Sequence, residues 1–125
     1  MHEVPGQHAQ PHCAQRTLPS LLRHFLTGTE LSPDELERLL ERADELKAAP
    51  LSSDALYRRT VALVFQAPST RTRTSFEAGV AELGGHPMVL RTEDTQLTRG
   101  ESVRDTAYIL SRNAAVIAIR TPSMT

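Results

Sequence analysis

The sequence predicts an α/β protein with helices on both faces of a short parallel sheet. Two short segments, 60–65 and 114–119, are apolar at nearly every position, which is typical of strands covered on both faces, and 86–90 is predicted as another short strand between them. Segments with helical periodicity lie between them, at 69–83 and 102–110. The order strand, helix, strand, helix, strand therefore predicts parallel strands joined by right-handed crossovers, in three α/β/α layers.

The composition is that of one ordinary soluble domain. The 125 residues are 39% hydrophobic and 23% charged, with a net charge of −1. A near-neutral charge argues against a general nucleic-acid binder, and no apolar run approaches the ~18 residues that a membrane span needs. The single cysteine, Cys13, fits a reducing compartment, and the first twenty residues lack the apolar core of a signal peptide. We therefore expect a cytoplasmic protein.

The N-terminal segment differs from the rest of the chain. Residues 1–19 are polar and without periodicity, and they predict a disordered tail ahead of one domain at 20–125. The tail holds His2, His8, His12 and Cys13, but their spacing matches no zinc pattern. We therefore expect no metal site.

The first helix is predicted between Ser32 and Pro50. Ser32 is an N-cap residue, Pro33 takes the first helical position, and Glu35 completes a capping box. Pro50 stops the helix. One apolar stripe follows the helical period: Leu36, Leu39, Leu40, Ala43 and Leu46.

Residues 69–77 read Ser-Thr-Arg-Thr-Arg-Thr-Ser-Phe-Glu, where the first predicted strand ends and a helix begins. The first N–H groups of a helix have no intrahelical partner, and the helix dipole is positive there. Acidic residues usually complement that charge, so an arginine in the first turn predicts an anionic ligand. A Ser/Thr-rich start that only caps the helix is the alternative interpretation. The residues suited to a phosphate are Ser69, Thr70, Arg71 and Thr72.

The neighbouring charges Arg73 and Glu77 are four residues apart and predict an ion pair with a structural role. The helix ends at Gly84-Gly85, a strong C-cap signal. After a polar loop at 91–100, another helix is capped by Ser102. Asp105 takes the capping-box position of this helix. Its predicted buried stripe consists of Val103, Thr106, Ala107 and Leu110.

The third predicted strand ends at Arg120. Ligands of parallel sheets bind beyond the carboxyl ends of the strands, at the point where strand order reverses. If the first and third strands are neighbours, Arg71 and Arg120 face the same crevice. The sequence therefore predicts a second cation for the anion site.

Several motifs together resemble the carbamoyl-phosphate half of the transcarbamoylases. They are, in order, Ser-Thr-Arg-Thr-Arg at 69–73, Gln-Leu at 96–97, Gly-Glu-Ser at 100–102 with Asp-Thr at 105–106, and Arg120. The resemblance covers roughly 23–121 and is closest to the ornithine carbamoyltransferases. Aspartate carbamoyltransferases share the first motif, but typically carry a serine- and lysine-containing loop where this chain has Thr-Gln-Leu-Thr-Arg at 95–99.

The resemblance implies a role for each matching residue. It implies that Arg120 approaches the carbamoyl oxygen and the phosphate of carbamoyl phosphate. It also implies that Gln96 reaches the carbamoyl-phosphate site of a neighbouring subunit, since transcarbamoylases are trimers. The implied reaction is attack of the ornithine δ-amine on the carbamoyl carbon, giving citrulline and phosphate in arginine biosynthesis and the urea cycle, without a metal or cofactor. Arg71 and Arg120 would stabilise the developing charge. The implied phosphate ligands are Ser69, Thr70, Arg71 and Thr72.

The ornithine-binding motifs of the family are absent from these 125 residues, so we expect a truncated chain that is inactive alone. Two alternatives stay open. One is a catalytically silent phosphate-binding or oligomer-interaction module, and the other is the corresponding half of a transcarbamoylase for another amine, such as aspartate. A nucleic-acid binder is disfavoured by the charge balance and the lack of interleaved aromatics around Arg71, Arg73, Arg99 and Arg104.

Overall fold

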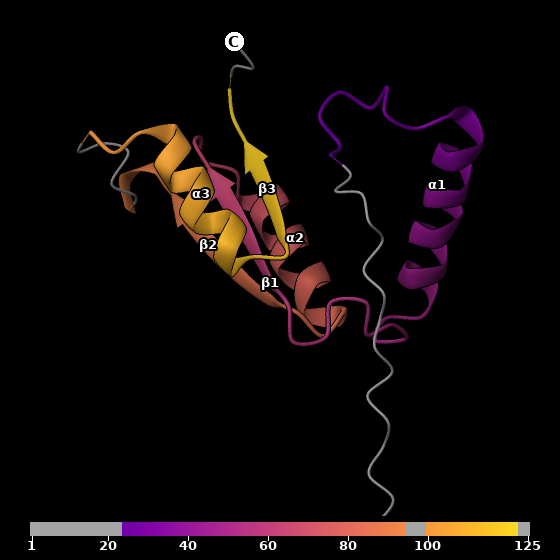
Figure 1. The fold of residues 1–125 in the computed structure, drawn as a ribbon. Coiled ribbons are helices and arrows are strands. Elements are labelled where there is room, and N and C mark those ends of the chain that lie inside the picture. The colour runs from indigo at the N-terminus through magenta and orange to yellow at the C-terminus, as the bar shows by residue number, and fades with distance from the viewer. Residues whose placement is uncertain (1–23, 95–99, 123–125) are drawn as a thin grey trace, which may run out of the picture.

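The computed structural model describes residues 24–94 and 100–122 (Figure 1). The predicted tail at 1–19 and the candidate ligand Gln96 lie outside these ranges. None of the helices in the described part is long and apolar enough to cross a membrane. The elements are α1 (Pro33–Ala48), β1 (Thr60–Phe65), α2 (Thr70–Glu82), β2 (His86–Arg91), the 3-10 helix η1 (Thr92–Asp94), α3 (Val103–Asn113) and β3 (Val116–Arg120).

The three strands form a parallel sheet in the order β2-β1-β3. Leu63 in β1 lies between Val89 of β2 and Ala118 of β3. Helix α2 covers one face of the sheet, and α3 lies over the other (Figure 1). The predicted three-layer arrangement is confirmed. The chain runs from β1 outward to β2 and then crosses back to β3, so the strand order reverses beside β1.

The core is small and centres on β1. Four consecutive residues of this strand, 61–64, are buried, together with Val80 of α2. A central parallel strand is covered on both faces, which explains why β1 is apolar at every position after Thr60. The expected buried stripe of α3 is wrong, because none of the residues of α3 is buried and Val103 is 74% exposed. A three-stranded sheet is too narrow to cover the whole apolar side of that helix.

Helix α1 has the predicted ends. The Ser32 hydroxyl accepts from the Glu35 N–H at 3.2 Å, and the Glu35 carboxylate accepts from the Ser32 N–H at 2.9 Å. The helix nevertheless stands apart from the sheet (Figure 1). Its apolar stripe is largely uncovered within the described ranges: the central leucines are 45–59% exposed, and only Leu46 near the end of the helix lines a cleft with Gly79 and Glu82 of α2. Those leucines are Leu36, Leu39 and Leu40.

Candidate anion-binding site at the start of helix α2

The start of α2 leaves hydrogen-bond donors free. Ser69 occupies the N-cap position as predicted, but its side chain makes no capping hydrogen bond. The N–H of Arg73 donates to the Ser69 carbonyl at 3.0 Å, which closes the first helical turn. The three N–H groups before it, of residues 70–72, therefore have no helical acceptor. No acidic residue stands in this turn, so the positive end of the helix dipole is not neutralised by the helix itself.

Arg120 reaches this turn from the end of β3. Its Nη1 donates to Oγ1 of Thr72 at 3.1 Å, across 48 residues of sequence. The Gln66 N–H donates to the Arg120 carbonyl at 2.9 Å and so holds the end of β3 beside β1. The expectation that the first and third strands are adjacent is thus confirmed. Arg120 lies where strand order reverses, which is where parallel α/β sheets bind ligands.

Arg71 points into solvent. Its backbone carbonyl accepts from the Ser75 hydroxyl at 2.9 Å, but its guanidinium has no hydrogen bond or ion pair among the described residues. A free guanidinium beside free N–H groups is well placed for an anion. Arg71 in α2 and Arg120 at the end of β3 therefore both lie near the helix start. They do not face one crevice as expected, because Arg120 lines a cleft beside β3 and Arg71 lines neither of the two clefts at this helix start.

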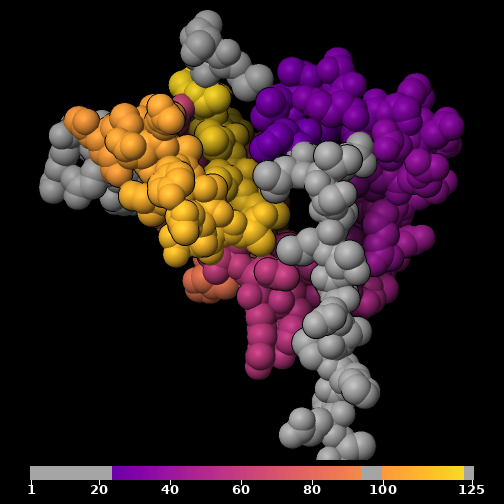
Figure 2. All heavy atoms as spheres, in the orientation of Figure 1, coloured from indigo at the N-terminus to yellow at the C-terminus, as the bar shows by residue number. Residues whose placement is uncertain are grey.

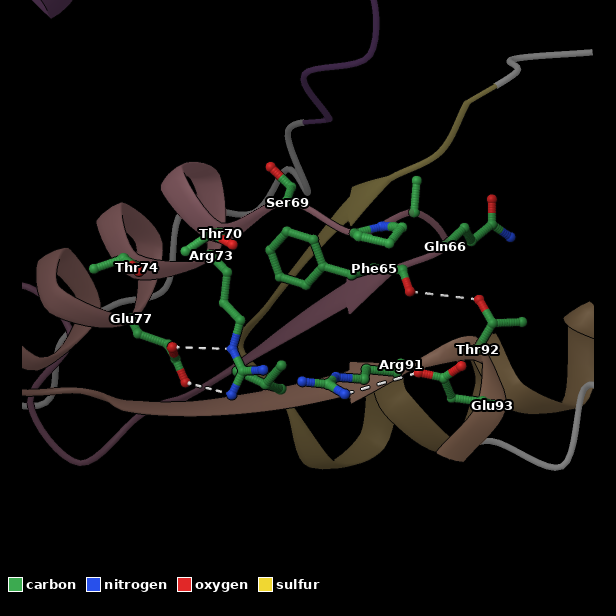
Figure 3. Close-up of a pocket in the computed structure, with 13 residues that line it drawn as sticks. Phe65, Gln66, Ser69, Thr70, Arg73, Thr74, Glu77, Arg91, Thr92 and Glu93 are labelled. Atoms are coloured by element: carbon green, nitrogen blue, oxygen red, sulfur yellow. Dashed lines mark hydrogen bonds and ion pairs between the residues drawn. The ribbon is translucent and has the colours of Figure 1, made fainter.

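Two clefts flank the start of α2. One, of about 480 Å³, lies on the β2 side and is lined by Ser69, Thr70 and Arg73 among others (Figure 3). The other, of about 560 Å³, lies on the β3 side and includes Thr72 and Arg120. The predicted phosphate ligands thus do not share one cavity, because Ser69 and Thr70 line one cleft and Thr72 lines the other.

The cleft on the β2 side has balanced charge. Arg73 donates to Glu77 through Nε at 3.2 Å and Nη2 at 3.5 Å (Figure 3), so the predicted ion pair is confirmed. A longer contact of 3.8 Å joins Arg91 to Glu93. Each of these cations has a carboxylate partner, whereas Arg71 and Arg120 have none among the described residues. Beside the two clefts, the cations without a carboxylate partner among the described residues are therefore Arg71 and Arg120.

Sequence reasoning missed several polar residues of the β2-side cleft. Gln66 follows β1, and Arg91 and Thr92 mark the end of β2. The Thr92 hydroxyl donates to the Phe65 carbonyl at 3.4 Å, which ties the two strand ends together. Their position at the carboxyl ends of strands was the available signal. No group of three His, Cys, Asp or Glu side chains suited to a metal ion occurs within the part of the chain that is described.

Comparisons with known proteins agree on one family. A model described as "Aspartate/ornithine carbamoyltransferase, carbamoyl-P binding domain" matches residues 23–125. An ornithine carbamoyltransferase of Parafrankia sp. strain EAN1pec is 50% identical over 103 residues, which are 79% of this chain and 32% of the relative. The chain spans about a third of the length of the curated relatives it matches.

Solved structures show the same similarity. The anabolic ornithine carbamoyltransferase of Campylobacter jejuni superposes with a TM-score of 0.73 and 38% identity, over 80% of this chain and 33% of the other. The catalytic subunit of the M. Jannaschii aspartate transcarbamoylase superposes with a TM-score of 0.69 and 30% identity, over 82% of this chain and 35% of the other. The fold is therefore shared by relatives named for different amine substrates.

Proposed function

Because the chain belongs to the aspartate/ornithine carbamoyltransferase family, we propose that it is the carbamoyl-phosphate-binding half of an ornithine carbamoyltransferase. The family match starts at residue 23, which supports a domain from about residue 20 preceded by a tail at 1–19. The complete reaction is transfer of the carbamoyl group from carbamoyl phosphate to L-ornithine, which yields citrulline and phosphate in the cytoplasm. The part of the relatives that this chain does not span is the proposed seat of ornithine.

The contact between Arg120 and Thr72 carries the proposal. It places a guanidinium without a carboxylate partner at the positive end of α2, beside three N–H groups without helical acceptors. A phosphate requires several donors around one centre, and this turn offers them from two elements. The proposed phosphate ligands are Ser69, Thr70, Arg71 and Thr72.

The proposed chemistry needs no covalent enzyme nucleophile. Phosphate is a good leaving group once its charge is neutralised, and attack by the amine forms an oxyanion at the carbamoyl carbon. Arg71 and Arg120 are the proposed stabilisers of both charges, with Arg120 directed at the carbamoyl oxygen. Donors fixed before reaction do not have to reorganise as the charge develops, which is why a rigid helix start suits this role.

The assembly is also part of the proposal. The family members are expected to act as trimers, with Gln96 of one subunit completing the carbamoyl-phosphate site of the next. Gln96 lies outside the described residues, so its role rests on the motif alone. A trimer would bring a further donor to a helix start that is open to solvent in one chain.

The test is an NMR titration of the chain with carbamoyl phosphate. Amide signals of residues 70–72 should shift. Thr72→Val removes the hydroxyl that bonds Arg120 and should weaken binding roughly 2- to 12-fold, which corresponds to one net hydrogen bond of about 0.5–1.5 kcal/mol. Thr74→Val is the matched control, because Thr74 lines the other cleft. Equal effects of the two variants, or shifts confined to another region, would refute the proposed site.

A second candidate is a phosphate-binding or interaction module without catalytic activity. The open, partner-free guanidinium of Arg71 among the described residues is compatible with binding alone as well as with catalysis. Both candidates predict ligand binding, and turnover separates them. Joining the chain to the remaining two thirds of the Parafrankia relative should yield citrulline from ornithine if the catalytic proposal is right. A folded, ligand-binding fusion that forms no citrulline would favour the silent module.

A further inference from the structure

The end of β2 carries an arginine under helix α2. Arg91 lies two residues after Val89 on this strand, so both side chains point to the same face of the sheet. Val89 packs against the core cluster that contains Val80 of α2, which makes this the face that α2 covers. Helix α3, orange to yellow in Figure 2, covers the opposite face. Arg91 therefore lies between α2 and the sheet, at the carboxyl end of β2.

A second arginine reaches the same place from the helix. Arg73 lies seven residues before Val80, which is two helical turns, and so faces the sheet as Val80 does. Both arginines line the cleft of about 480 Å³ on the β2 side. In Figure 3 the guanidinium groups of Arg73 and Arg91 point toward one another, and each has its carboxylate on the far side. Like charges that approach across a cleft repel each other, and an anion between them turns this repulsion into attraction.

Neither guanidinium is saturated by its carboxylate. Arg73 donates to Glu77 through Nε and Nη2, at 3.2 and 3.5 Å, which leaves its Nη1 without an acceptor among the described residues. The Nη1 of Arg91 is 3.8 Å from Oε1 of Glu93, which is beyond hydrogen-bonding distance. A guanidinium has five N–H donors, so most of the donors that face this cleft are available to a ligand.

The surroundings favour a monoanion with an apolar body. Glu77 and Glu93 already balance the two cations, so a single added negative charge is better compensated than the two charges of a phosphate. A planar carboxylate also matches the planar donor fork of a guanidinium. The apolar lining beside the arginines includes Phe65, Pro68 and Val89. Aliphatic groups of a ligand gain free energy when they are buried against such a wall.

We propose that this cleft is a binding site for a small organic carboxylate, whose charged group lies between Arg73 and Arg91 and whose aliphatic part contacts Phe65. The site goes beyond the proposed function, and it uses neither Arg71 nor Arg120. Its occupant lies one helical turn from the start of α2, so the negative charge opposes a phosphate bound there. The cleft therefore acts as a regulatory site for the anion site beside it.

The experiment titrates the chain with butyrate, a monocarboxylate with a short aliphatic body, and follows the arginine Nε–H and backbone amide signals by NMR. The signals of Arg73 and Arg91 should shift and saturate, and the uncharged butyramide should leave them in place. Arg91→Ala should weaken butyrate binding roughly tenfold or more, because hydrogen bonds to a charged group are lost. Arg91→Lys keeps the charge and should give a smaller loss.

Arg42→Ala is the matched control. Arg42 is 53% exposed, against 55% for Arg91, and it also has a carboxylate partner, but it lies on α1 outside the cleft. This control should bind butyrate as the parent chain does, and the circular dichroism of all the variants should match that of the parent.

Equal losses for Arg91→Ala and Arg42→Ala, or butyrate shifts confined to residues 70–72, would overturn the proposal. Tighter binding of inorganic phosphate than of butyrate at the two arginines would overturn the assignment of a carboxylate. The titration contains no carbamoyl phosphate, so its outcome does not depend on the proposed function. Carbamoyl phosphate added afterwards should bind more weakly to the butyrate-saturated chain, and an unchanged affinity would overturn the regulatory role.

Discussion

The two arginines at the start of α2 should differ sharply in their effect on carbamoyl-phosphate binding. The guanidinium of Arg71 has no partner among the described residues, so its donors are available to a ligand. That of Arg73 is held by Glu77 at 3.2 Å. Arg71→Ala and Arg73→Ala therefore remove groups of the same size and charge from opposite sides of the first turn, but only the first should remove a ligand contact.

The magnitudes follow from these contacts. A hydrogen bond to a charged group contributes about 1.5–3 kcal/mol, so Arg71→Ala should lower affinity roughly 10- to 150-fold. Arg73 and Glu77 are 38% and 36% exposed, and a pair that exposed stabilises a helix by only tenths of a kcal/mol. Arg73→Ala should therefore change affinity less than about threefold through long-range charge alone.

The assay is calorimetric or NMR titration of carbamoyl phosphate into each variant at two ionic strengths. The circular dichroism of the variants should match that of the parent chain, which separates loss of binding from loss of fold. Arg71→Lys keeps the charge but loses the planar donor fork, and it should give an intermediate loss. Equal losses for Arg71→Ala and Arg73→Ala would refute the division of roles between the two side chains.

Three further predictions concern stability and activity. A Cβ at Gly85 would lie 2.9 Å from the Leu56 Cβ and 3.0 Å from the Val80 Cγ1, so Gly85→Ala should destabilise by about 1–3 kcal/mol in urea denaturation. A Cβ at Gly79 in α2 would meet no atom within 4 Å, so Gly79→Ala should stabilise the folded chain by about 0.5–1 kcal/mol. A Gly85→Ala variant more stable than Gly79→Ala would contradict the packing. Backbone N–H groups, first that of Glu30 itself and then that of Leu26, lower the pKa of the Glu30 carboxyl from 4.5 to about 2. This carboxylate should therefore order the 26–30 turn above pH 4.5, and the turn should be lost as the pH falls toward 2. Amide NMR of the parent chain and of Glu30→Gln measures this, and a turn that does not depend on pH would disprove it. The chain alone should form no citrulline above background, because the proposed amine seat lies outside it, and a turnover near 10 per second would show otherwise.

Short-range patterns in the sequence were sufficient to predict where the helices begin and end. The capping box and N-terminal proline of α1, the Ser102 cap of α3 and the glycine that follows α2 act within about four residues, and the structure has them where they were expected. The Asp105 carboxylate accepts from the Ser102 hydroxyl, so the second bond of a capping box is not made in α3. Strand β1 was equally predictable, because a short run that is apolar at every position after Thr60 is typical of a strand buried on both faces. The third strand begins two residues later than expected, at Val116, since its first residues lie in the connection from α3.

The sequence by itself determined the element types, the three-layer class and the place of the candidate anion-binding motif at a helix start, because each depends on patterns along the chain. Tertiary structure alone decided that β1 and β3 are adjacent and that Arg120 therefore bonds Thr72. It also decided that the Ser69 hydroxyl is free, although its residue type favours capping. Contacts between residues 48 positions apart depend on strand order and crossover direction, and these are set by packing across the whole sheet and not by any local pattern.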